Sequence, residues 1–189
     1  MSDIVLEPAA QEFADATAKP PLLYELGVEG ARKLLDDVQA QPVEKLDVDE
    51  KWITVPAQAG EVRVRVIKPV GSTGVLPVIL YVHGGGWILG DAGTHDRLVR
   101  ELAVGARAAL VFVEYDRSPE AKYPVAIEQA YATARWITTK GAQEGLDGSR
   151  LVVAGDSVGG NMSAALTTQA SSMAIEQAVH VLRKALGTA

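Results

Sequence analysis

Hydrophobic positions along the chain follow two kinds of spacing, and each kind marks a different predicted element. In some segments apolar residues recur every three to four positions, which favours helices, and in others they form short alternating or fully apolar runs, which favour strands. Helices are predicted for Ala9 to Ala18, Val28 to Ala40, Thr94 to Ala106, from Pro124 onward, and Val158 to Ala170. Strands are predicted for Lys51 to Val55, Val62 to Val66, Val78 to Val82, Ala109 to Tyr115 and Leu151 to Ala154.

Two kinds of strand are distinguishable. The run from Val62 to Val66 alternates valine with Arg63 and Arg65, so it is expected to bury one face and turn its arginines to solvent. The runs beginning at Val78, Ala109 and Leu151 are apolar throughout, as expected for strands covered on both faces. Because these strands alternate with helices, the sequence predicts an α/β fold with a parallel-dominated sheet.

The chain divides into three expected parts: N-terminal helices over residues 1–45, an α/β core over 46–170 and a C-terminal helix over 171–189. No strand is recognisable after Leu151 to Ala154, so this apolar strand is expected at a sheet edge. An exposed apolar edge favours pairing with another chain, and a homo-oligomer formed through it is therefore an expectation.

Composition narrows the function classes. The net charge of −6 and the pI near 5.1 argue against nucleic-acid binding, because no basic surface is available to neutralise phosphates. There is no cysteine, and the three histidines lack acidic neighbours at ligand spacing, so neither a metal site nor a cofactor is expected. The acidic N-terminus and the short apolar run from Val75 to Val82 predict a cytoplasmic protein without membrane association.

A serine lies between the predicted strand Leu151 to Ala154 and the predicted helix from Val158. Gly155-Asp156-Ser157-Val158-Gly159 has the G-x-S-x-G pattern of a tight turn that raises a serine hydroxyl above the sheet. The helix that starts there directs its N-terminal amides toward developing negative charge. Ser157 is therefore a candidate nucleophile; the alternative is a passive serine in a glycine-rich turn.

A second glycine-rich segment follows the predicted strand Val78 to Val82. In His83-Gly84-Gly85-Gly86-Trp87, three consecutive glycines expose backbone amides with no side chains in the way. Such amides can form an oxyanion hole, in which the loss of one donor costs roughly 100- to 1000-fold in rate. The alternative is a flexible loop.

Together the two segments resemble the hormone-sensitive-lipase-like branch of the α/β-hydrolases. Tyr115-Asp116-Arg117-Ser118-Pro119-Glu120 followed by Tyr123-Pro124 loosely matches a third motif of that branch. The resemblance implies an α/β-hydrolase fold and hydrolysis of carboxylic esters, with short acyl chains as the expected substrates. It implies Ser157 as nucleophile, the amides of Gly85, Gly86 and Val158 as the oxyanion hole, His83 and Gly84 as support of the loop, and the N-terminal helices as part of a lid.

The chain departs from that branch in two ways. Val158 replaces an alanine, and its branched side chain is expected to crowd the acyl pocket. After Ser157 the only carboxylate is Glu176 and the only histidine is His180, both on a predicted helix where a surface pair is expected. His83 and His95 are not expected to serve as the base either. The acid and base of the relatives are therefore expected to be lost with a removed segment, and impaired activity is expected. A receptor-like protein that binds small molecules without catalysis, and an inactive truncated fragment, remain as alternatives.

Overall fold

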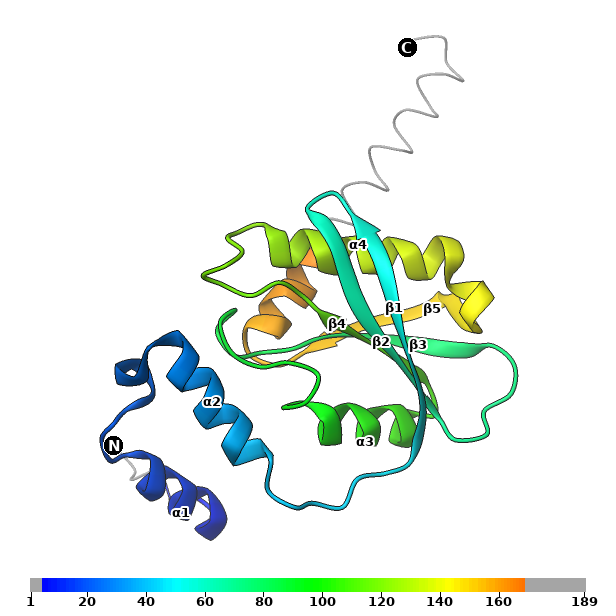
Figure 1. Ribbon diagram of the computed structural model, residues 1–189. Coiled ribbons are helices and arrows are strands. Elements are labelled where there is room, and N and C mark those ends of the chain that lie inside the picture. The colour runs from blue at the N-terminus through cyan, green and yellow to red at the C-terminus, as the bar shows by residue number, and fades with distance from the viewer. Residues whose placement is uncertain (1–4, 169–189) are drawn as a thin grey trace.

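A five-stranded sheet with helices on both faces organises the chain in a computed structural model that describes residues 5–168 (Figure 1). The strands are β1 (Val48–Ala57), β2 (Gly60–Pro69), β3 (Leu76–Val82), β4 (Ala109–Glu114) and β5 (Leu146–Gly155), in the spatial order β1-β2-β4-β3-β5. The helices are α1 (Pro8–Thr17), η1 (Leu23–Leu26), α2 (Gly27–Gln39), α3 (Asp96–Ala106), α4 (Val125–Lys140) and η2 (Gly141–Glu144). Residues 158–168 form a further helix.

The sheet combines an antiparallel hairpin with a parallel part. β1 pairs antiparallel with β2, and β2 pairs antiparallel with β4, whereas β3 lies parallel between β4 and β5. The carboxyl ends of β3 and β5 meet in register, with Val82 opposite Gly155. A bulge interrupts the same pair upstream, because Pro77 lies opposite Asp147 but Val78 lies opposite Leu151. The two glycine-rich segments thus leave adjacent parallel strands at the same sheet edge.

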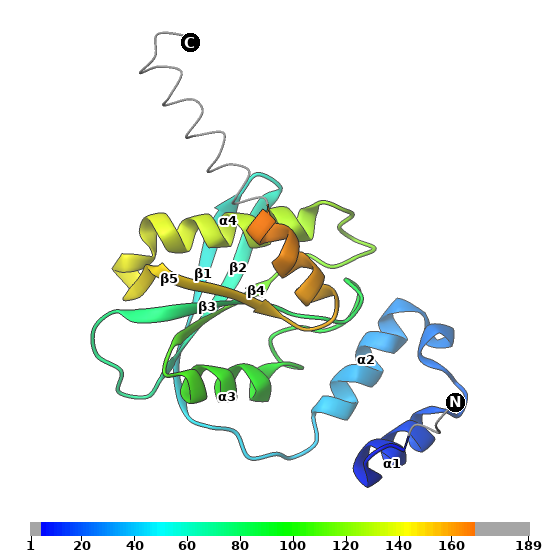
Figure 2. The same cartoon turned by 180° about the vertical axis from the view of Figure 1, so that it is seen from behind.

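Helices cover the sheet in two layers. α4 and the helix of residues 158–168 lie on one face, and α3 lies on the other (Figures 1 and 2). β4 is apolar on both sides because both faces are covered: Val111 packs in one core cluster, and Leu110 and Phe112 pack in the other. The apolar runs beginning at Val78 and Ala109 therefore correspond to the central strands β3 and β4, as predicted. The run from Leu151 to Ala154 lies instead in β5 at the edge of the described sheet, where Val152 is 58% exposed, so the expectation that both of its faces are covered is wrong.

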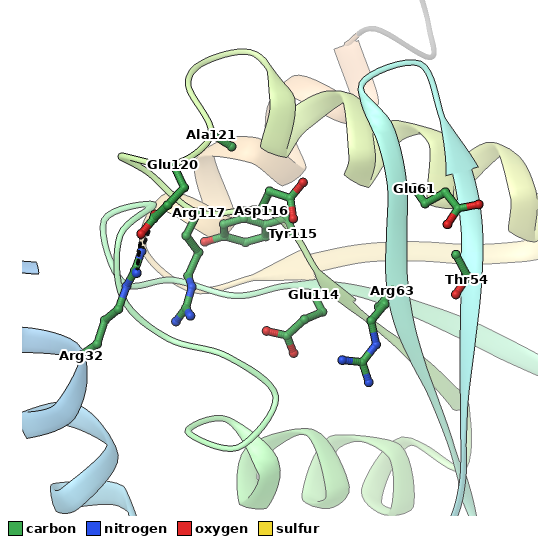
Figure 3. Close-up of a pocket in the computed structure, with 10 residues that line it drawn as sticks. All are labelled: Arg32, Thr54, Glu61, Arg63, Glu114, Tyr115, Asp116, Arg117, Glu120 and Ala121. Carbon is green, nitrogen blue, oxygen red and sulfur yellow. Dashed lines mark hydrogen bonds and ion pairs between the residues drawn. The ribbon is translucent and has the colours of Figure 1, made fainter. Parts of the chain in front are cut away.

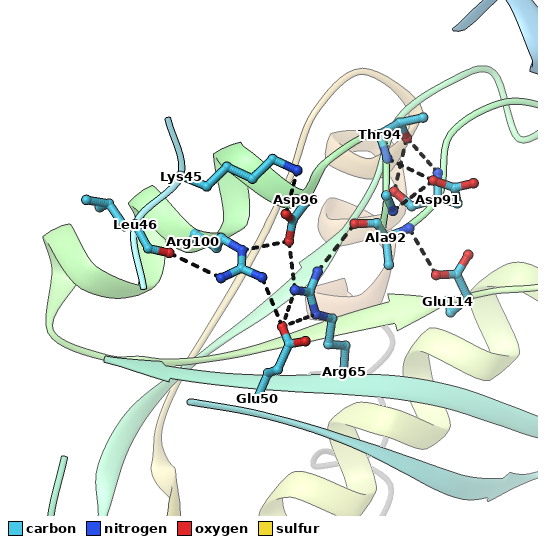
Figure 4. Close-up of polar contacts among 11 residues, drawn as sticks. Lys45, Leu46, Glu50, Arg65, Asp91, Ala92, Thr94, Asp96, Arg100 and Glu114 are labelled. Carbon is cyan, nitrogen blue, oxygen red and sulfur yellow. Dashed lines mark hydrogen bonds and ion pairs between the residues drawn. The ribbon is translucent and has the colours of Figure 1, made fainter. Parts of the chain in front are cut away.

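Arg65 corrects the prediction for β2. Its side chain is only 5% exposed, although the alternation of the sequence placed it on a solvent-facing side. The reason is that α3 covers this face, where the guanidinium of Arg65 pairs with Asp96 at 2.7 Å and with Glu50 (Figure 4). Lys45 and Arg100 each reach the Asp96 carboxylate at 2.8 Å. The alternating sequence pattern does not distinguish an arginine that is buried beside carboxylates from an arginine that faces solvent, because both environments accommodate its charge.

The N-terminal helices lie beside the layered core, near the ends of β3 and β4 (Figure 1). α1 buries no residue, and α2 buries only Ala31. The division into a lid over residues 1–45 and a core from residue 46 remains a proposal, and the expected helix over 171–189 lies outside the described residues. None of the helices within residues 5–168 is long and apolar enough to cross a membrane.

The candidate active site

Ser157 stands on the turn between β5 and the next helix. β5 ends at Gly155 and the helix begins at residue 158. The backbone of Ser157 has a φ of 51°, in the left-handed region that a serine rarely adopts. The residue is exposed, and its hydroxyl forms no hydrogen bond with any other residue between 5 and 168. Such local strain is typical of a functional turn that presents a side chain to an incoming molecule.

A close backbone approach explains the glycine two positions after the serine. A Cβ added to Gly159 would lie 1.9 Å from the carbonyl oxygen of Val82 and 2.8 Å from that of His83. Both oxygens belong to the backbone at the end of β3, which neighbouring strands hold on both sides. The start of the helix can therefore pack against β3 only if residue 159 has no side chain.

The glycine loop that follows β3 is a tight turn. Gly85 has a φ of 100°, and an added Cβ would meet the carbonyl oxygen of Leu89 at 2.3 Å. The amides of Ile88 and Leu89 both donate to the carbonyl of Gly85, at 3.1 and 2.8 Å. These bonds draw the loop into a compact turn whose Gly85 conformation is open to glycine and costly for other residues.

Asp156 joins the two segments. Its Oδ1 accepts the backbone amide of Gly84 at 2.9 Å and the hydroxyl of Tyr81 at 2.8 Å. His95 at the start of α3 brings its Nε2 to 3.6 Å from the same oxygen. One carboxylate therefore fixes the glycine loop beside the Ser157 turn, and the structure brings the sequence-predicted residues of both motifs together.

The amides of Gly85, Gly86 and Val158 are available as donors. Among the described residues, none of the three donates a hydrogen bond to a protein acceptor. The amide of Val158 is at the first turn of a helix, where backbone N–H groups have no partner within the helix. Free amides at a helix start and in a glycine loop attract an oxygen that carries negative charge.

Neither described histidine contacts the Ser157 hydroxyl. His83 is fully buried, stacks on Tyr115 with 4.1 Å between ring centroids, and has Nδ1 2.8 Å from the carbonyl oxygen of Gly84. Burial lowers the pKa of His83 to about 4, so its ring is neutral at pH 7 and donates from Nδ1. His95 occupies the N-cap position of α3 and makes no side-chain capping bond there. Glu176 and His180 lie outside the described residues.

Two cavities flank the meeting point of the motifs. One of about 350 Å³ is mostly apolar and borders Gly86, Trp87 and Met162. The other, of about 480 Å³, borders Gly85, His95 and Asp156. A larger cavity of about 700 Å³ has charged walls and includes neither Ser157 nor the three free amides, so it is not the candidate site (Figure 3). Within residues 5–168 no group of three histidine or acidic side chains could hold a metal ion.

Two residues near the site have contacts there that the sequence pattern did not predict. Tyr81 precedes the glycine motif in an apolar strand, where the sequence pattern indicates only core packing. Arg32 lies on the predicted helix Val28 to Ala40 as one of several charged positions, yet its guanidinium contacts the glycine loop through the carbonyl of Ile88 at 2.9 Å. Asp156 is visible in the sequence only as the residue before Ser157, and its contact with the Gly84 amide comes from the fold.

Comparison with known proteins identifies the fold family. A family model described as the alpha/beta hydrolase fold matches residues 79–186, which include both glycine motifs and the Ser157 turn. The chain belongs to the α/β-hydrolase family. Within this family, relatives that are named esterases support the hormone-sensitive-lipase-like esterase branch.

Several curated relatives of this α/β-hydrolase chain are named esterases or carboxylesterases. It is 43% identical to esterase LipI of Mycobacterium tuberculosis over 150 residues, covering 78% of this chain and 46% of that protein. Carboxylesterase NlhH of the same organism is 42% identical over 142 residues, covering 74% of this chain and 44% of that protein. The chain thus spans about half the length of the curated relatives it matches.

A solved structure shows the same architecture. A thermostable esterase from Pseudomonas putida superposes with a TM-score of 0.86 at 40% identity, covering 92% of this chain and 56% of that one. The α/β-hydrolase fold of the described residues is therefore that of an esterase family, and the chain corresponds to part of the fold.

Proposed function

We propose that this chain carries the nucleophile and the oxyanion hole of a serine carboxylic-ester hydrolase. The observation that carries the proposal is the junction of the two motifs: the Asp156 carboxylate accepts the Gly84 amide at 2.9 Å beside the strained turn of Ser157. Membership in an esterase family supports the same chemistry.

The reaction has two steps in this proposal. The Ser157 Oγ attacks the ester carbonyl, and its proton passes to a base as the carbonyl oxygen becomes negative. The amides of Gly85, Gly86 and Val158 then stabilise that oxygen, the bond to the alcohol oxygen breaks as the base returns its proton to it, and an acyl-enzyme remains. A water molecule gives a proton to the base and attacks the acyl carbonyl, and the acid leaves as the base returns that proton to the Ser157 Oγ.

The substrate proposed is a small ester with a short acyl chain. The apolar cavity beside Gly86, of about 350 Å³, is at the small end of the usual range of roughly 300–1000 Å³ for ligand pockets. Trp87 and Ile88 from the glycine loop and Met162 from the helix after Ser157 line its walls. Apolar side chains of this kind suit an acyl or alcohol group without charge.

The presence or absence of a catalytic base distinguishes ester hydrolysis from ligand binding without catalysis. Neither His83 nor His95 hydrogen-bonds to Ser157, and we propose that the isolated chain hydrolyses esters far more slowly than a complete triad does. The same observation favours a second candidate function, in which the chain binds small apolar esters in this cavity without turning them over.

Ester hydrolysis with a matched variant tests both functions. We expect slow release of nitrophenol from a short-chain nitrophenyl ester, abolished in Ser157→Ala, and correspondingly slow labelling of Ser157 by a fluorophosphonate, because both reactions need a base that activates the serine. Saturable binding of a non-hydrolysable ester analogue with no difference in hydrolysis between the chain and Ser157→Ala would support the binding function instead.

The assembly and location of the chain complete the proposal. β5 forms the edge of the described sheet, and Val152 on it is 58% exposed, so we propose that two chains associate through this edge. Size-exclusion chromatography with light scattering tests this, and a monomer at micromolar concentration would contradict it. A cytoplasmic location, expected from the sequence, also stays a proposal, which fractionation of expressing cells tests.

A further inference from the structure

One arginine connects three separate segments of the molecule. Arg32 lies on helix α2, and its Nε donates to the carbonyl of Ile88 at 2.9 Å while its Nη2 donates to that of Ser118 at 3.0 Å. Its Nη1 and Nη2 also donate to the two carboxylate oxygens of Glu120, each at 2.8 Å (Figure 3). A guanidinium is a rigid planar fork, so four simultaneous hydrogen bonds fix its position and that of its helix.

The segment held through Ile88 is the loop that carries the free amides. The Ile88 amide closes the turn onto the carbonyl of Gly85 at 3.1 Å, and the Trp87 carbonyl accepts the Ser118 amide at 2.8 Å. The backbone of Ile88 is therefore held on both sides, by Gly85 through its amide and by Arg32 through its carbonyl. A change in the position of Arg32 acts on the same short turn that orients the Gly85 and Gly86 amides.

Apolar packing does little to hold α2 in place. Ala31 is its only buried residue, and Leu34 and Val38 are each 39% exposed. A helix with so little buried apolar surface gains little free energy from docking. The polar contacts of Arg32 therefore carry a large share of its attachment to the core.

The same helix forms one wall of a cavity at the site. Leu35 and Gln39 line the cavity of about 480 Å³ that Gly85, His95 and Asp156 also line. Leu35 follows Arg32 by three residues, so both side chains lie on one side of α2. The contact that orders the glycine loop thus also sets the position of the cavity wall.

We propose that Arg32 is a positioning residue that latches helix α2 onto the glycine loop, so that placement of this helix over the cavity and ordering of the oxyanion-hole amides are coupled. The latch consists of Arg32, Glu120 and the carbonyls of Ile88 and Ser118. It acts through the loop and does not touch the reacting atoms; its catalytic meaning rests on the function proposed above.

The latch responds to salt and not to pH near neutrality. The hydrogen bonds from Arg32 lower the pKa of Glu120 to about 2, so the pair stays charged over the whole physiological range. Glu120 is 58% exposed, however, and added salt screens an ion pair that is open to solvent. Loosening of α2 and of the glycine loop is therefore expected to increase together as the salt concentration rises.

Hydrogen exchange followed by mass spectrometry tests the latch without requiring catalysis. In Arg32→Ala we expect amides of residues 84–90 to exchange about tenfold faster or more, together with those of α2, because hydrogen bonds to a charged group are lost. Peptides from β3 and β4 should exchange as in the parent. Lys33→Ala is the matched control, since within residues 5–168 Lys33 forms an ion pair with Asp37 alone, on the same helix, and its side chain is 75% exposed.

Two further measurements keep the result decisive. Glu120→Gln leaves the two carbonyl acceptors of Arg32 in place, so a smaller rise in exchange of the loop amides is expected. If Arg32→Ala exchanges fast throughout the chain because it unfolds, the exchange of the loop in Glu120→Gln tests the latch instead. Exchange of residues 84–90 in the parent should rise with sodium chloride, and this response should disappear in Arg32→Ala and Glu120→Gln.

Loop exchange that is unchanged in both variants, or a salt response that persists in both, would overturn the proposal. An inert Ser157 with faster loop exchange in the variants would instead contradict the proposed esterase function and leave the latch standing.

Discussion

Replacement of Gly159 by alanine is expected to destabilise the fold strongly. The added Cβ would stand 1.9 Å from the carbonyl oxygen of Val82, whereas carbon and oxygen without a bond between them stay more than about 3 Å apart. The start of the helix would have to move by about 1 Å, because β3 lies between β4 and β5 and cannot yield. Overpacking of this kind costs about 1–3 kcal/mol, and more where backbone is the obstacle, so we expect a loss of about 2–4 kcal/mol.

Gly105→Ala provides a control of opposite sign. Gly105 lies within α3, it is exposed, and an added Cβ would meet no atom within 4 Å. Alanine favours the helix over glycine by up to about 1 kcal/mol, so this variant should be more stable than the parent.

Urea unfolding followed by circular dichroism measures both free energies of unfolding. We expect a lower urea midpoint for Gly159→Ala and an equal or higher one for Gly105→Ala, with similar slopes. A Gly159→Ala protein within about 0.5 kcal/mol of the parent, the usual range of surface substitutions, would refute the claim that the Ser157 turn packs directly on β3.

Three further predictions concern charged and polar groups. Asp156→Ala leaves two buried donors, one of them the Gly84 amide, without their acceptor and should cost about 2–4 kcal/mol in urea unfolding, whereas Asp156→Asn keeps an acceptor oxygen and should cost less. Burial lowers the pKa of His83 from 6.5 to about 4, so on acidification the imidazole is protonated in the unfolded chain before it is protonated in the folded one. The free energy of unfolding should therefore fall by up to about 3 kcal/mol as the pH drops from 6.5 to 4. His83→Phe should remove that part of the pH dependence. Burial opposes ionisation of Asp96, but hydrogen bonds from cations including Arg65 lower its pKa to about 2. Arg65→Ala should therefore lower the free energy of unfolding by about 3–5 kcal/mol at pH 7. An unchanged thermal stability would contradict the buried network.

The sequence predicted the strands better than the contacts between distant side chains. The apolar runs at Val78 and Ala109 marked β3 and β4 because both faces of a central strand are buried. Ser157 was expected on a turn because a strand pattern, two glycines and a helix pattern follow one another, and the structure places it there. Its role as nucleophile stays a prediction.

The contacts of long side chains could not be predicted from the sequence, for a physical reason. Arg65 obeys the alternation of an exposed position, and only the covering helix α3 and its Asp96 reveal that it is buried. Arg32 contacts Glu120 across 88 positions of sequence, a distance at which no periodicity carries information. The short helices η1 and η2 were also missed, since single turns have too few residues to show a repeat.

The bulge in β5 has a consequence for how the chain can vary over evolution. Residues 148–150 loop out between the pairs Pro77–Asp147 and Val78–Leu151, and the stretch from Val78 to Val82 then pairs without interruption up to Gly155. A strand slipped by one residue would shift the Ser157 turn by about 3.3 Å and reverse the faces of β5. Gly148 packs on the backbone of α4, where an added Cβ would lie 2.7 Å from the Thr138 Cα, but Ser149 and Arg150 are exposed. Insertions or deletions at these two exposed positions can be absorbed before the strand reaches its last five pairs, whereas the same change beyond Leu151 reaches the turn. Length variation among homologues should therefore concentrate at residues 149–150 and be rare in the remainder of the strand.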